Sequence, residues 1–287
     1  MNYTIKNGKY ALTVSDMGAE PISLKLGDRE LLWQNTGDFW SKHAPVLFPL
    51  CGRLPEGKYT LGDVTYEMKC HGFAASTKFE LTEQTDCKLK FAIQDTEETR
   101  AQFPFEFRLE AEYSLTGDTV SIYYTLCNRS DKEMPYMFGW HPGFSYPDSV
   151  SVLEDIVFDF GDLEELTLFP LREDFSVDSV GHAVPAKGGI YKAETDFLYK
   201  TDTIILGRHN NALSLYTKEN DLRFDFSWSE NLPSLCIWKE PDDTARFICI
   251  EPWTSLPGIG ENFDTRDMRR LPAGECETFT YNLKFTN

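Results

Sequence analysis

The fold is decided by residues 105–115, Phe105-Glu-Phe-Arg-Leu-Glu-Ala-Glu-Tyr-Ser-Leu115, in which every odd-numbered residue is apolar. Successive residues of a β-strand point to opposite faces, so this alternation predicts a strand with one buried face. Gly-Asp pairs that favour tight turns occur at 27–28, 62–63 and 117–118. Similar alternation recurs in residues 88–94, 120–126, 222–228 and 279–285. We therefore expect antiparallel strands connected in meanders.

Helical periodicity is nearly absent from this sequence. Residues 95–102, DTEETRAQ, could form one or two helical turns before Pro104 ends them. No βαβ rhythm appears, and we see no internal repeat or linker. The sequence predicts an all-β fold, a large antiparallel β-sandwich formed by one domain over residues 1–287. Residues 170–187 are expected to be a long surface excursion within it.

Composition limits the ligands. The chain has 46 Asp and Glu against 28 Lys and Arg, a formal net charge of −18, and no basic run. Nucleic acid is therefore an unsuitable partner, and a neutral small molecule fits best. We find no signal-peptide pattern at the N-terminus and no uncharged run of about 18 residues that could span a bilayer, so we expect a cytoplasmic protein without membrane contact.

Several kinds of site are unsupported. The seven cysteines form no CxxC pair, and most are expected to be reduced, half-buried strand residues. The five histidines show no HxH or HExxH spacing, so no metal site is predicted. The GxSxG, GxGxxG and P-loop motifs are missing as well.

Two residues are candidate proton carriers. His141 lies in Phe138-Gly-Trp-His-Pro-Gly-Phe144, where two glycines and a proline constrain the backbone around a side chain suited to proton transfer. Glu251 ends the apolar stretch Phe247-Ile-Cys-Ile-Glu, and desolvation there would raise its basicity. A loop-capping His141 and a water-facing Glu251 are the structural alternatives.

Further candidates lie in glycine-bounded segments. Arg53, between Gly52 and Gly57, could donate hydrogen bonds to hydroxyls or act only in a surface ion pair. His71 precedes Gly72 at an expected sheet rim. Flat aromatic faces can stack on a pyranose, and three tryptophans near these segments are candidates for that role: Trp140, Trp238 and Trp253.

In order and spacing, these segments resemble the aldose 1-epimerase (galactose mutarotase) family, in particular its LacX-like branch. The resemblance runs from Gly18-Ala-Glu20 through Gly52-Arg-Leu-Pro-Glu-Gly-Lys-Tyr59, His71-Gly72 and His141-Pro142 to Asp202 and Glu251. It implies a galactose mutarotase-like supersandwich and an isomerase that interconverts the α and β anomers of a sugar.

The resemblance also implies roles. Glu251 would be the general base at the anomeric hydroxyl, and His141 the acid at the ring oxygen. Arg53, His71 and Asp202 would bind the substrate. No cofactor is implied, the partner is a small-molecule sugar, and the chain is expected to be a monomer or a homodimer.

The sugar itself is left open. Phe73 stands where the usual mutarotase has a second glycine, and Ala75 where the branch acting on hexose 6-phosphates has arginine. A free hexose is the leading expectation. The alternatives are a hexose 6-phosphate, a non-catalytic carbohydrate-binding or sugar-sensing sandwich, and a lyase or glycosidase, which would usually need two carboxylates.

Overall fold

The structure is a computed structural model. It describes residues 1–146, 155–173, 175–177, 180–191, 203–207, 209–217, 223–240, 242, 244–258, 262–264 and 266–286. Antiparallel strands dominate it, as the alternation predicts, and the all-β fold class is confirmed.

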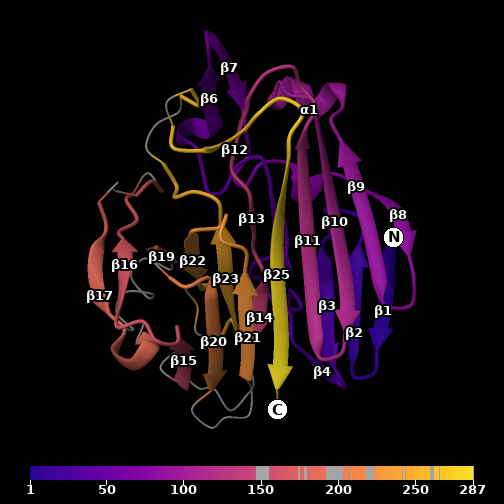
Figure 1. Cartoon of the computed structure of the whole chain (residues 1–287), viewed down its shortest axis with the longest axis vertical. Coiled ribbons are helices and arrows are strands. Elements are labelled where there is room, and N and C mark those ends of the chain that lie inside the picture. The colour runs from indigo at the N-terminus through magenta and orange to yellow at the C-terminus, as the bar shows by residue number, and fades with distance from the viewer. Residues whose placement is uncertain are drawn as a thin grey trace.

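A nine-stranded antiparallel sheet, in the order β18-β15-β20-β21-β25-β11-β10-β9-β8, forms one layer (Figure 1). In β10 each odd-numbered residue is buried, which confirms the pattern of residues 105–115. The turn at Gly117 joins β10 to β11, and its φ of +60° suits glycine. The strands of this sheet are β8 (Glu80–Gln84), β9 (Lys88–Gln94), β10 (Phe107–Thr116), β11 (Thr119–Asn128), β15 (Ile156–Asp159), β18 (Ile190–Tyr191), β20 (Ala212–Thr217), β21 (Arg223–Trp228) and β25 (Cys276–Thr286).

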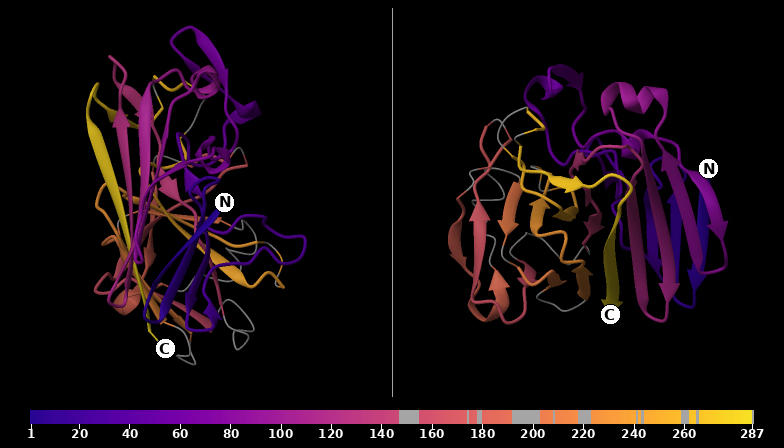
Figure 2. Two further views of the ribbon diagram at one scale, coloured as in Figure 1. Left: turned by 90° about the vertical axis from the view of Figure 1, so that its right-hand side faces the viewer. Right: turned by 45° about the horizontal axis from the view of Figure 1, so that its top comes forward.

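The second layer contains an eight-stranded sheet and a four-stranded sheet at the N-terminus (Figure 2). An isolated bridge between Leu32 and Phe144 connects the two. The eight-stranded sheet consists of β5 (Val46–Leu47), β13 (Gly139–Trp140), β14 (Gly143–Ser145), β16 (Glu165–Phe169), β17 (His182–Pro185), β19 (Thr203–Gly207), β22 (Ser234–Trp238) and β23 (Phe247–Trp253). The four-stranded sheet consists of β1 (Asn2–Asn7), β2 (Tyr10–Ser15), β3 (Pro21–Leu26) and β4 (Arg29–Glu30).

The remaining elements are short. The helix α1 (Glu97–Gln102) confirms the helical turns expected in residues 95–102, and Thr96 caps it through a capping box. The others are the strand pairs β6 (Lys58–Leu61) with β7 (Val64–Glu67) and β12 (Met134–Tyr136) with β24 (Arg269–Leu271), and the 3₁₀ turns Pro55–Gly57, Ala74–Ser76 and Lys187–Gly189.

Aromatic side chains fill the space between the layers. Trp140 of β13 packs against Phe226 of β21 and Tyr281 of β25, with ring centroids 6.0 and 5.3 Å apart. Phe144 of β14 likewise packs on Phe224, 4.6 Å away. These contacts join the eight-stranded sheet to the nine-stranded sheet, as a sandwich requires.

Two expectations need correction. Residues 170–187 are not simply a surface excursion, since Val177 is buried and Leu171 and Phe175 line a cavity. Of the seven cysteines, Cys127 and Cys276 form a disulfide between directly paired positions of β11 and β25. The other five are free, which confirms that most are reduced, but three of them are buried and two exposed rather than half-buried. No helix in the described part of the chain is long and apolar enough to cross a bilayer.

Candidate active site

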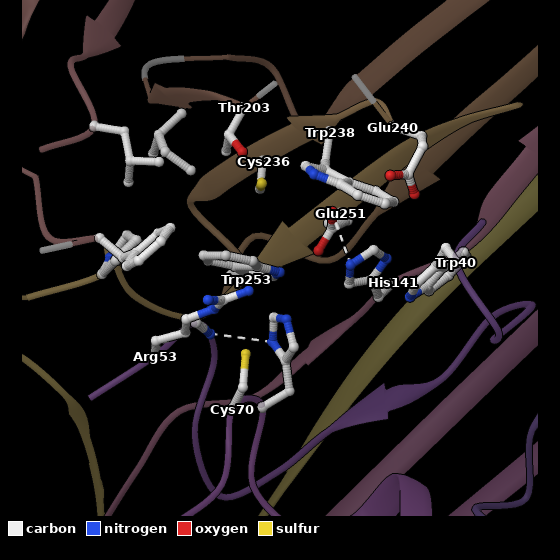
Figure 3. A pocket seen from close by; sticks show the side chains of 16 residues that line it. Trp40, Arg53, Cys70, His141, Thr203, Cys236, Trp238, Glu240, Glu251 and Trp253 are labelled. Carbon is white, nitrogen blue, oxygen red and sulfur yellow. Dashed lines mark hydrogen bonds and ion pairs between the residues drawn. The ribbon is translucent and has the colours of Figure 1, made fainter. Parts of the chain in front are cut away.

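One face of β19, β22 and β23 forms the floor of a cavity of about 480 Å³ (Figure 3). Alternation along β23 places Glu251 and Trp253 on the same side. The register sets Cys236 opposite Glu251, and Ile205 opposite Cys236 in turn. All four line the cavity, whose volume is in the usual range for small-molecule sites.

Strand β23 is buried along its whole length. Its other face carries Ile248 and Ile250, which belong to the main core. Burial on both faces explains why residues 247–253 form a continuous apolar run instead of alternating. A carboxyl group in this strand is withdrawn from water.

The two candidate proton carriers lie side by side. Nε2 of His141 is 3.3 Å from Oε1 of Glu251, and the two side chains are 8% and 1% exposed. His141 directly follows the short strand β13, which pairs with β23 through Gly139 and Trp253. The pairing of β13 with β23 therefore brings together two residues that are far apart in the sequence.

Burial changes the proton affinity of both groups. It raises the pKa of the Glu251 carboxyl well above its usual value, while the Cys236 thiol and the Trp253 indole act in the opposite direction. Burial also lowers the pKa of His141 well below the ordinary range, and the neighbouring His71 ring, wherever it is protonated, acts in the same direction. The buried environment therefore disfavours the charged form of Glu251 and the charged form of His141.

His71 and the loop at Gly52 together form a wall of the cavity. The Gly52 amide donates to Nδ1 of His71 over 3.1 Å, and the His71 amide donates to the Gly52 carbonyl over 2.9 Å. Because Nδ1 accepts a hydrogen bond, the proton of the neutral ring lies on Nε2. Burial and the neighbouring Arg53 lower the pKa of His71 to about 4, so the ring is neutral at pH 7.

Arg53 stands at the rim of the cavity. Its guanidinium lies over the ring of Phe175, 4.5 Å from the centroid. The contact is a cation–π interaction and fixes the side chain beside the cavity. Among the described residues, no ion pair, the structural alternative, holds Arg53.

Comparisons with known proteins agree with this geometry. The sequence pattern of the aldose 1-epimerase family matches residues 1–263. This chain belongs to the aldose 1-epimerase family.

Relatives of this aldose 1-epimerase family member span nearly its whole length. The chromosomal LacX protein of Lactococcus lactis subsp. lactis is 27% identical over 268 residues, covering 89% of this chain and 88% of the relative. The structure is similar to a galactose mutarotase related enzyme from Lactobacillus acidophilus, with a TM-score of 0.91, 30% identity, and coverage of 100% and 98% of the two chains. A galactose mutarotase-like protein from Lactobacillus casei ATCC 334 has a TM-score of 0.91, 27% identity, and coverage of 100% of both chains.

The structure brings most of the expected site residues together. Six of them line the same cavity: Arg53, His71, His141, Trp238, Glu251 and Trp253. Asp202 lies outside the described residues.

Trp140 does not line the cavity, which corrects its expected role in stacking on a sugar. Its side chain is 1% exposed, and its Nε1 donates to the Ala44 carbonyl. The alternation of β13 turns Trp140 toward the core between the sheets. His141, one residue later, faces the cavity instead.

Other lining residues escaped the sequence analysis. Trp40, Cys236, Glu240 and Phe175 all border the cavity. Cys236 was recognisable only through its pairing with Glu251. Trp40 and Phe175 lie in irregular segments without periodicity, so their approach to the site depends on contacts between residues far apart in sequence.

Phe73 packs in the core. Its ring contacts Phe48 and Phe107 at centroid distances of 5.9 Å each. It does not line the cavity of about 480 Å³ in the described part of the chain. Phe73 therefore supports the His71 loop from the side of the core.

Three side chains of types that bind metal ions lie close together beside the cavity. His141, Cys249 and Glu251 are the one such group among the described residues, with potential ligand atoms within 4.8 Å of one another. Metal ligands must be deprotonated to bind. Burial raises the pKa of both Cys249 and Glu251 well above their usual values and so opposes the loss of protons that metal binding would require.

Proposed function

We propose that this protein is an aldose 1-epimerase that interconverts the α and β anomers of a free hexose. The observation that carries the proposal is the buried contact of 3.3 Å between His141 and Glu251 at the floor of the cavity. Ring opening of a hemiacetal needs one proton acceptor and one proton donor close together. A site that only binds sugar has no need of such a pair.

In the proposed reaction, Glu251 accepts the proton of the anomeric hydroxyl while His141 donates a proton to the ring oxygen. The bond between the anomeric carbon and the ring oxygen breaks, and the anomeric carbon becomes an aldehyde. After rotation about the adjacent carbon–carbon bond, the two residues reverse their roles and the ring closes on the other face. Protons balance over the cycle, and no cofactor takes part.

The shifted pKa values keep one proton within the pair. Burial disfavours charge on Glu251 and on His141, so this proton lies mainly on Glu251, and the reaction starts from the form in which it has moved to His141. A pair with one proton contains one donor and one acceptor at all times. Neither group has to recover its starting state from solvent between opening and closure.

Neighbouring residues supply recognition in this proposal. The Nε2–H of His71 and the Arg53 guanidinium donate to oxygen atoms of the sugar, because both border the cavity. Trp238 and Trp253 offer aromatic faces to the C–H face of the pyranose. We retain Asp202 as a ligand of a hydroxyl group on the strength of the family resemblance.

Charge in the cavity supports a free sugar over a hexose 6-phosphate. Among the described lining residues, Arg53 carries the only permanently positive side chain, and Glu240 adds a second carboxylate beside Glu251. The formal net charge of −18 also repels a phosphate.

Exchange NMR on freshly dissolved anomers of glucose and galactose tests the activity directly. We expect the wild-type protein to accelerate anomer exchange above the rate in buffer, and Glu251→Gln or His141→Asn to lose about 10²–10⁴-fold of that acceleration. Saturable sugar binding with no acceleration would instead favour the non-catalytic sugar-binding alternative. Acceleration with hexose 6-phosphates alone would move the proposal to that substrate.

A further inference from the structure

The cavity continues past Glu251 to a side that is lined by apolar residues. In Figure 3, Glu251 lies between Trp40 on one side and Arg53 on the other. We call the apolar lining residues the apolar flank; they are Leu171, Phe175, Ile205 and Pro257. A cavity of about 480 Å³ falls in the range of sites that hold drug-sized ligands, which are larger than one hexose. The apolar flank therefore offers space for more than the sugar ring that reacts.

Phe175 is the exposed aromatic residue of the apolar flank. It is 44% exposed and is one of only five large apolar residues with an exposed surface in the described part of the chain. One face of its ring meets the Arg53 guanidinium, 4.5 Å from the centroid. Contact of an aromatic ring with water is unfavourable, so a ligand that covers the rest of this ring gains free energy.

The backbone holds Phe175 at the cavity in a conformation that a bulky residue rarely adopts. Its φ is +63°, in the left-handed region that favours glycine and asparagine. The Phe175 amide donates to the Arg172 carbonyl over 3.0 Å. Buried Val177, two residues later, donates its amide to the Pro257 carbonyl over 3.0 Å. Such strained positions cluster at ligand sites, because the surrounding contacts must enforce them.

We propose that the apolar flank is a second sugar subsite and that the substrate class is a reducing disaccharide. The inference rests on the proposed function and extends it. The reducing hexose lies over Glu251 and His141, and the second ring places its C–H face on Phe175. Arg53 lies against Phe175 and donates to hydroxyl groups where the two rings meet. An aromatic face beside guanidinium donors suits a sugar, whereas a purely apolar group would leave the donors unpaired.

NMR titration of the protein with glucose, cellobiose, maltose and melibiose tests the subsite. The three disaccharides end in a reducing glucose and differ in their linkage. We expect at least one of them to bind the wild-type protein about 2–10-fold more tightly than glucose, as one aromatic stacking contact predicts.

Phe175→Asn should abolish this preference, with a smaller change in the affinity for glucose. Asparagine suits the φ of +63°, so the variant should fold with an unchanged or higher Tm. Phe175→Tyr keeps the aromatic face and should keep the preference. In exchange NMR, Phe175→Asn should lower kcat/KM for the preferred disaccharide more than for glucose.

Val180→Asn is the matched control. It also replaces an exposed apolar residue within residues 170–187, but Val180, which is 77% exposed, is not among the described residues that line the cavity. The preference for the disaccharide should persist in this variant.

If no disaccharide binds the wild-type protein more tightly than glucose, the inference is overturned. Equal losses of affinity for glucose and disaccharide in Phe175→Asn would overturn it too, because Phe175 would then act only by holding Arg53. Binding is measured without turnover. A preference for a disaccharide in the absence of anomer exchange would therefore refute the proposed function and support the subsite.

Discussion

The carboxyl group of Glu251 lies where water barely reaches, and its chemistry follows from that position. The burial of Glu251 could be predicted from the sequence, because this residue ends the apolar run Phe247-Ile-Cys-Ile and such runs lie in buried strands. Trp40 could not be found in the same way. Its contact with His141 depends on how an irregular segment folds back over the sheet, and local sequence does not encode that approach.

The half-buried, neutral His71 makes stability depend on pH. Its pKa is about 4 in the folded protein and about 6.5 when unfolded, so the unfolded chain binds more protons between these values. Its contribution to the free energy of unfolding is therefore fully present above about pH 6.5 and is lost as the pH falls toward about 4.

His71→Asn tests this dependence, since asparagine tolerates the φ of +63° and its Oδ1 can accept from Gly52 as Nδ1 does. Urea unfolding of both proteins at pH 7 and pH 4 should show a smaller acid-induced loss in the variant, by about 2 kcal/mol. Equal losses in the two proteins would contradict the assigned pKa.

At the level of elements, the strands were more predictable than the loops that complete the site. Alternation located β9, β10, β11 and β25, because a half-buried strand shows its period directly in sequence. The alignment of Glu251 with Cys236 is a register between separate strands, which no local pattern reveals. The loop that contains His71 and the segment from Phe48 to Gly52, which it contacts, depend on such long-range contacts even more.

Gly72 allows the His71 loop to approach the backbone of Phe48 closely. Its φ is +73°, and a Cβ there would lie 2.3 Å from the Phe48 carbonyl oxygen. We expect Gly72→Ala to destabilise the protein by about 2–4 kcal/mol and to displace His71, lowering activity.

Gly62→Ala is the matched control for this substitution. Gly62 has a similar φ of +57°, and a methyl group added there would meet nothing within 4 Å, so only the backbone cost of about 1 kcal/mol applies. Thermal or urea unfolding measures both variants. Similar losses for the two would show that the close approach to Phe48 does not matter.

For the whole molecule, the sandwich presents a sheet face on which segments from distant parts of the chain meet. The chain belongs to the aldose 1-epimerase family. Composition alone had indicated only a folded, strongly acidic protein. The net charge of −18 nonetheless has a measurable consequence for substrate choice.

Ionic strength should distinguish neutral from phosphorylated sugars. Screening weakens repulsion between the acidic protein and a phosphate, while a neutral hexose experiences no such repulsion. We expect kcat/KM for a free hexose to change little between low salt and about 0.5 M salt, and any activity on a hexose 6-phosphate to rise. A fall with added salt for the phosphate would indicate a basic subsite and would mean that local charge outweighs the net charge.

Proton exchange between Glu251, His141 and a sugar is the step on which the proposed function depends, and NMR of anomer exchange at equilibrium observes it without a coupled assay. Wild-type protein should transfer magnetisation between the α and β anomers of a free hexose faster than buffer does. Glu251→Gln, folded and with its sugar affinity retained, should return the exchange to nearly the buffer rate. Wild-type acceleration that survives in Glu251→Gln would refute the role of Glu251 as the base.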